Sequence, residues 1–94
     1  MIKWVSETDA NGTCYWLNLS DNIEVSLFKD NKDNSPYLYS FKWDADSGML
    51  CRWTEHMTAE NWDEAKSKGI ARTKRIISSY LNELNCAMEE LNHG

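Results

Sequence analysis

Apolar and polar residues alternate along the first half of the chain in four runs. The runs are TCYWLNLS (13–20), IEVSLFK (23–29), YLYSFKW (37–43) and MLCRWTEH (49–56). A period of two is typical of strands that bury one face. Turn-forming residues separate the runs, at DN (21–22), DNKDNSP (30–36) and DADSG (44–48). The pattern therefore predicts a four-stranded antiparallel β-meander, with IKWV (2–5) as an optional further strand or cap.

The alternation also predicts the register of the hairpins. Leu19 should oppose Ile23 across the loop Ser20–Asp21–Asn22, with Asn22 in the left-handed conformation that such loops require. In the second hairpin, Trp43, Phe41 and Tyr39 should oppose Met49, Cys51 and Trp53 in turn, with Gly48 available for a positive φ.

From Trp62 onward the apolar residues follow helical spacing. They are Ala65, Gly69, Ile70, Ile76, Ile77, Tyr80, Leu84, Ala87, Met88 and Leu91. At 100° per residue they fall on one side of a helix. Asn61 followed by Glu64 is a capping-box-like start, and Asp63 adds an acid to the first turn. We therefore predict one α+β domain over 1–94, with one long C-terminal helix at about 62–91 across the apolar sheet face.

Four aromatic residues, Tyr37, Tyr39, Phe41 and Trp43, share one side of the strand at 37–43. The helix needs that side of the sheet. An RNA-binding sheet would instead carry its stacking aromatics on the uncovered face. The aromatic strand is therefore predicted to be core.

Charge is unevenly distributed along the chain, whose net charge is −5. Residues 1–65 carry five basic and twelve acidic side chains, 66–75 carry five basic and no acidic ones, and 76–94 carry three acids without Lys or Arg. A general nucleic-acid binder is usually basic overall. An acidic body with one basic segment does not match that class.

Three cysteines at wide, unpatterned spacing argue against a disulfide framework and for a reducing compartment. No charged-then-apolar leader follows Met1, and the chain has no long apolar run. We therefore expect a cytoplasmic protein without a secretion signal or a membrane span.

Sequence motifs for enzyme chemistry are missing. His56 and His93 are the only histidines, and neither stands at metal-ligand spacing from a Cys, Asp or Glu. The sequence has no P-loop, Gly-rich nucleotide loop or nucleophile elbow. Asp44 and Asp46 share one turn, and Asp30 and Asp33 share another. Paired acids in turns usually accept hydrogen bonds from the backbone rather than bind a metal ion. We predict no catalytic residues, no metal site and no cofactor.

The open sheet face should carry Trp16, Phe28, Leu38 and Leu50 among polar residues. This is more apolar surface than scattered exposure usually gives. It is either a patch for a protein partner, with Trp16 and Phe28 as anchors, or a surface covered by the segment around Trp4.

Two further surfaces lie on the helix. Lys68, Arg72 and Arg75 form an outward stripe that is either a phosphate-reading face or simply solvated. About thirty helical residues span roughly 45 Å, whereas seven-residue strands span roughly 23 Å. Leu81, Leu84, Met88 and Leu91 therefore need cover from a partner, from a second protomer, or from a break near Asn82 or Asn85. Helix-mediated dimerisation is the preferred explanation.

The strand–helix junction, WTEH (53–56) followed by NWDEAK (61–66), resembles small proteins of phages and mobile elements in which a Trp-rich meander precedes a polar-capped helix. The resemblance covers about residues 13–75, and the helix of this chain is longer. It implies a small cytoplasmic accessory protein of a bacterial host, of a class that includes inhibitors of bacterial defence such as anti-CRISPR proteins. Those act by occupying a surface, often with acidic side chains in place of nucleic-acid phosphates.

The sequence thus favours an acidic protein-binding inhibitor anchored by Trp16 and Phe28. Its expected acidic contacts are Asp30, Asp33, Asp44, Asp46, Glu60, Asp63 and Glu64. The alternatives are a nucleic-acid-binding module that uses the basic stripe, and a homo-oligomeric structural or regulatory subunit joined by the overhanging helix. The expected partner is a protein or a ribonucleoprotein complex, whose identity is open.

Overall fold

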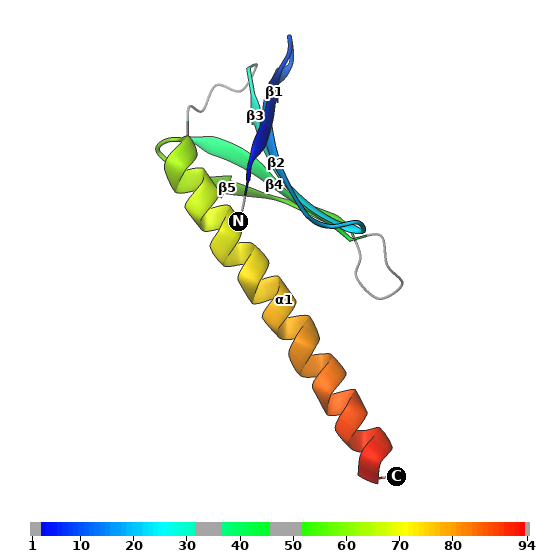
Figure 1. Cartoon of the computed structure of the whole chain (residues 1–94). Helices are drawn as coiled ribbons and strands as arrows, with labels where there is room; N and C mark the ends of the chain where they lie inside the picture. The colour runs from blue at the N-terminus through cyan, green and yellow to red at the C-terminus, as the bar shows by residue number, and fades with distance from the viewer. Residues whose placement is uncertain (1–2, 32–36, 46–51, 94) are drawn as a thin grey trace.

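The computed structural model describes residues 3–31, 37–45 and 52–93 (Figure 1). Its elements are β1 (Val5–Thr8), β2 (Gly12–Ser20), β3 (Ile23–Asp30), β4 (Leu38–Ala45), β5 (Trp53–Thr58) and α1 (Trp62–His93). The strands form one antiparallel sheet in the order β1-β2-β3-β4-β5. The predicted α+β class and antiparallel sheet are confirmed, but the sheet has five strands rather than four.

The additional strand, β1, pairs with β2 at the edge of the sheet, where Val5 opposes Trp16. Three of the four residues in its sequence VSET are polar and all four are exposed, which suits a short edge strand. Trp4, just before it, packs against the hydrophobic core. The expectation that the segment around Trp4 covers the open sheet face is therefore wrong.

The hairpin of β2 and β3 keeps the expected register over most of its length, because Leu17 opposes Val25 and Tyr15 opposes Leu27. The turn differs from the prediction. Ser20, not Leu19, opposes Ile23, and the register shifts between Asn18 and Ser20. Within the described residues no non-glycine residue has a positive φ, so the left-handed conformation expected at Asn22 does not occur. A bulge at Leu19 takes the place of the three-residue loop.

The hairpin of β4 and β5 pairs four residues later than expected. Trp43 opposes Trp53, and Tyr39 opposes Met57. The predicted start of this strand at Met49, together with Gly48 and Cys51, lies outside the described residues. A shift of an even number of residues leaves the same side chains on each face.

The core lies between the sheet and α1. Four side chains are fully buried, Val25, Leu27, Phe41 and Trp43, and Tyr39 is nearly so. Tyr37 is 53% exposed. The prediction that the aromatic strand forms core is therefore confirmed for three of its four residues.

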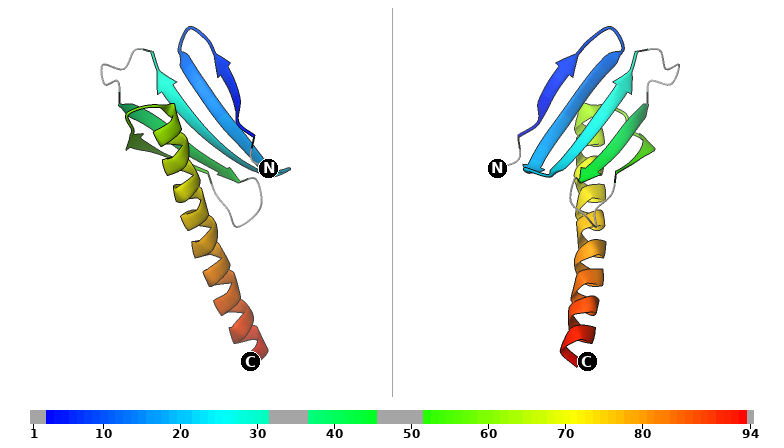
Figure 2. Two further views of the ribbon diagram at one scale, coloured as in Figure 1. Left: turned by 60° about the vertical axis from the view of Figure 1, so that its left-hand side comes forward. Right: turned by 90° about the vertical axis from the view of Figure 1, so that its right-hand side faces the viewer.

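The helix begins where the sequence predicts. The backbone N–H of Glu64 donates to Oδ1 of Asn61 at 2.9 Å, which makes Asn61 the N-cap. The helix then buries Ala65, Gly69, Thr73 and Ile76 and packs on β3 and β4. Figure 2 shows that only one face of the sheet carries the helix.

The second half of α1 projects beyond the sheet (Figures 1 and 2). Every residue from 81 to 93 is exposed. The molecule measures 55 × 23 × 23 Å with a radius of gyration of 15.8 Å, whereas a compact chain of this length has about 12 Å. The helix runs unbroken through Asn82 and Asn85, so the expected alternative of a break at these residues is wrong.

Candidate functional site

The projecting half of α1 carries a continuous row of apolar side chains. Its members are Ile77, Leu81, Leu84, Met88 and Leu91, called the seam below, and they are 36 to 75% exposed. The sequence predicted four of them as contacts. The fifth, Ile77, joins the row where α1 leaves the sheet. Contiguous apolar surface of this kind marks interaction sites in soluble proteins.

The seam has the spacing of a coiled coil. Its members follow one another at intervals of four, three, four and three residues. This alternation keeps apolar side chains on the line where two helices cross at a small angle. These intervals can be read from the sequence alone, so the sequence was sufficient to predict all five members of the seam.

An apolar groove continues the seam onto the sheet. Its lining residues are Leu17, Leu19, Ile70, Thr73, Lys74 and Ile77, and its volume is about 130 Å³. Leu19, which stands at the bulge of β2, is 40% exposed there. Sequence reasoning missed this groove because it placed Leu19 in the regular ladder opposite Ile23.

The open sheet face holds the two predicted anchors side by side. Trp16 opposes Ser26 on β3, and Phe28 stands two residues further along the same strand. Both rings are half-buried, and no described element lies over this face (Figure 2). Leu38 lies at one end of the face, and Leu50 lies outside the described residues.

The thiol of Cys14 stands opposite Phe28 on this open face. Burial raises its pKa, and the carboxylates of Glu24, Glu7 and Asp9 raise the pKa further, while Lys42 acts in the opposite direction. Glu24 and Glu7 thus lie close enough to this part of the open face to act on the thiol, with Lys42 as the opposing charge.

The predicted acidic contacts fall at two ends of the sheet. Asp30, Glu60 and Asp63 are exposed, and with Glu64 they lie near the end where β5 turns into α1. Asp44 lies at the other end, where its Oδ2 is 3.2 Å from Arg52 Nε and 3.9 Å from Lys42 Nζ. Asp33 and Asp46 lie outside the described residues. The described acids therefore do not form one cluster.

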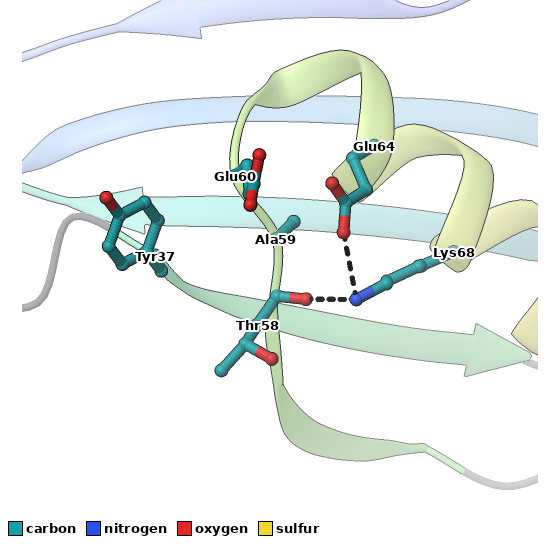
Figure 3. A pocket seen from close by; sticks show the side chains of 6 residues that line it. All are labelled: Tyr37, Thr58, Ala59, Glu60, Glu64 and Lys68. Carbon is teal, nitrogen blue, oxygen red and sulfur yellow. Dashed lines mark hydrogen bonds and ion pairs between the residues drawn. The ribbon is translucent and has the colours of Figure 1, made fainter.

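A hollow of about 460 Å³ lies at the junction of β5 and α1 (Figure 3), lined by Tyr37, Thr58, Ala59, Glu60, Glu64 and Lys68. Lys68 Nζ donates to the carbonyl oxygen of Thr58 at 2.6 Å and lies 3.1 Å from Glu64 Oε1. The Lys68 ammonium group therefore already contacts two oxygen atoms of the protein. Through these two contacts Lys68 joins the first turns of α1 to the end of β5.

The predicted basic stripe does not face outward as a unit. Arg72 donates from Nε and Nη2 to the two carboxylate oxygens of Glu55, at 2.6 and 3.4 Å. Lys68 also turns toward β5, and only Arg75 of the three is exposed without a described contact to the sheet. The outward stripe is therefore wrong for Arg72, which is partly buried against Glu55. Lys68 is exposed as predicted, and it also joins α1 to the edge strand β5.

Within residues 3–31, 37–45 and 52–93, no three His, Cys, Asp or Glu side chains stand together as ligands for a metal ion. The described part of the chain also has no helix with the length and apolar character needed to cross a membrane. The chain matches no protein-family model, no curated protein and no solved structure.

Proposed function

We propose that this chain is a protein-binding module whose contact surface is the seam of α1. The observation that carries the proposal is the row of five apolar side chains exposed beyond the sheet. Exposure of apolar surface to water costs a free energy of about 25 cal/mol per Å² of accessible area. Docking a second apolar surface on the seam removes that contact.

The base of the molecule supports this role. The ion pair of Arg72 with Glu55 and the hydrogen bond of Lys68 to Thr58 hold the first half of α1 against β5. The buried residues Ala65, Gly69 and Ile76 hold the same half on the sheet. A helix fixed at one end presents its other end with little loss of conformational freedom on binding.

The test uses tagged full-length chain as bait in nuclease-treated bacterial lysate supplemented with untagged chain. Leu84→Glu places a charge in the seam, and Ser79→Glu places the same charge on the far side of α1. The tagged wild type and the tagged Ser79→Glu variant should each retain a protein, either the untagged chain or a component of the lysate. The Leu84→Glu variant should not retain it. The proposal fails if nothing is retained in a seam-dependent way.

A second candidate is the inhibitor function, in which the open sheet face occupies a surface of a bacterial defence complex, as the resemblance to anti-CRISPR-like accessory proteins implies. Trp16 and Phe28, which are diagonal neighbours on the open face, and the carboxylates of Glu24 and Glu7 near Cys14 favour it. Aromatic anchors in a charged surround are typical of contact surfaces. Trp16→Ala should then weaken capture of such a complex more than Glu24→Gln does, and added salt should slow association. Equal capture by both variants would contradict this candidate.

The nucleic-acid hypothesis has less support. Two of its three cations, Lys68 and Arg72, already contact oxygen acceptors on β5. A gel shift at low salt with duplex and single-stranded probes tests it directly, with the Lys68/Arg72/Arg75 triple Ala variant as the comparison.

A further inference from the structure

We propose that the partner of the seam is a second copy of this chain, docked antiparallel along α1, with Leu91 of each copy at the groove of the other. The inference rests on the proposed function and names its partner. Four features of the described residues carry it: the spacing of the seam, the division of charge along α1, the uncharged flanks of the seam and the position of the groove.

The spacing of the seam is self-complementary. A two-fold axis midway between Leu81 and Leu84 brings Leu81 of one copy against Leu84 of the other. The same axis brings Ile77 against Met88 and Lys74 against Leu91. An isologous interface of this kind uses one patch twice. The overlap from 74 to 91 extends about 27 Å along the helix.

Charge divides α1 into two halves of opposite sign. Residues 66–75 carry five cations, whereas 76–94 carry Glu83, Glu89 and Glu90. The antiparallel arrangement sets Lys74, which lies beside the seam, level with Glu89 and Glu90 of the second copy. A parallel arrangement would place the two Lys74 ammonium groups together at the interface. Opposite charge therefore favours the antiparallel dimer.

The helix dipole adds to this preference. Glu89 and Glu90 lie near the negative end of α1, where acidic side chains are unfavourable, and His93 alone supplies a basic residue to the last turn. Lys74 of the second copy would offset that negative charge. The projecting half of α1 has no cation of its own among residues 76–92 with which to do so.

The residues that flank the seam are uncharged. They are Ser78, Tyr80, Asn85, Ala87 and Asn92. Charges at these positions usually select partners in coiled coils, with like charges excluding self-association. Without them, nothing beside the seam repels an identical helix. The small side chains of Ser78 and Ala87 also let two helices approach closely.

The groove gives the end of the second helix a place to pack. With Leu91 of the second copy at the level of Lys74, its isobutyl group reaches the space between Ile70, Ile77 and Leu19. That space is about 130 Å³, comparable with apolar cavities of about 150 Å³ that bind benzene. The lysine stem covers the packed leucine while its ammonium stays in water.

Light scattering on the full-length chain measures the first consequence. The wild type at about 100 μM should have twice the 10.9 kDa mass of one chain. Leu84→Glu and, independently, Met88→Glu should halve that mass, whereas Ser79→Glu should not. Circular dichroism of each variant verifies that the fold is kept. A wild type that stays at 10.9 kDa overturns the proposal.

Small-angle X-ray scattering on the wild-type dimer measures the orientation. The antiparallel dimer places its two sheets at opposite ends, so the distribution of interatomic distances should have two maxima. A single maximum from sheets lying side by side overturns the antiparallel arrangement. If the wild type is monomeric but retains another protein through the seam, the proposed function stands and the second copy is excluded. If neither occurs, both proposals fail.

Discussion

Gly69 of α1 lies against Leu27 of β3, so that a Cβ added at Gly69 would stand 3.4 Å from Leu27 Cδ2. That distance is ordinary van der Waals contact. We expect Gly69→Ala to raise the free energy of unfolding by about 0.5–1 kcal/mol, because alanine has the higher helix propensity. Gly69→Leu should lower it by about 1–3 kcal/mol by pushing α1 off β3. Urea unfolding followed by tryptophan fluorescence measures both.

Gly12 should respond in the opposite way to the same substitution. Its φ is +157°, and a Cβ there would overlap the carbonyl oxygen of Lys29 and stand 2.9 Å from Phe28 Cζ. We expect Gly12→Ala to lower the free energy of unfolding by about 1–3 kcal/mol. Gly69→Ala is the matched control. Equal stability of the two variants would contradict the close approach of β2 and β3 at this point.

The pair of Arg72 with Glu55 should couple α1 to β5. Both side chains are about one-third exposed, so the interaction is partly screened by water. A double-mutant cycle with Arg72→Ala and Glu55→Ala should give a coupling free energy of about 0.5–1 kcal/mol. Arg72→Lys should lose most of it, because lysine cannot bind both oxygens in parallel. Arg75→Ala, at an exposed position, should change stability by less than about 0.5 kcal/mol.

The thiol of Cys14 should make stability fall at alkaline pH. Its pKa is raised above 9.0, first by burial and then by Glu24, so the unfolded chain loses the thiol proton before the folded chain does. The free energy of unfolding should therefore be constant up to about pH 8 and fall beyond it. Burial and then Glu64 raise the pKa of Tyr39 above 10.0, which extends the fall to higher pH. Cys14→Ala should remove the earlier part of the fall and leave the later part.

Alkylation at pH 8 offers an independent measure of the same thiol. Cys14 is half-buried and Cys86 is exposed, and the thiolate is the reactive form. Iodoacetamide should label Cys86 faster than Cys14 in the folded chain, with the difference lost in urea. Peptide mapping by mass spectrometry separates the sites. Faster labelling of Cys14 would contradict the raised pKa.

The sequence predicts α1 well because three independent features agree there. The Asn61 cap, the 3.6-residue period and the position of Gly69 all describe one helix on one sheet. The strand at 23–29 is equally well predicted, because Val25 and Leu27 are buried and alternate with less buried residues. The strand at 13–20 is found as well, although Leu17 is buried and Leu19 is exposed. Where a side chain must be either in the core or in water, the pattern of residues decides the structure.

The errors have a common physical origin. Glu55 stands opposite Phe41 on the face that carries the helix, where alternation predicts an apolar residue. Arg72, seventeen positions later in the chain, pairs with this partly buried carboxylate, and no local pattern records such a contact. The optional strand was predicted at 2–5, but β1 occupies Val5–Thr8, where no face is buried and alternation gives no signal. The register of β5 was open to a four-residue slip, since both registers place the same side chains in the core.

The strand order also has a consequence for how the chain folds. Each strand pairs with the strand that precedes it in sequence. Every hairpin can therefore form from its own turn and needs no contact with distant segments of the chain. The loops to be closed are short, and the associated entropy loss is small. During synthesis on the ribosome the sheet emerges first, and α1 then meets a surface that is already complete. In a nascent chain the sheet can therefore fold before α1 is complete. The apolar seam is then exposed only after the sheet that anchors α1 has formed.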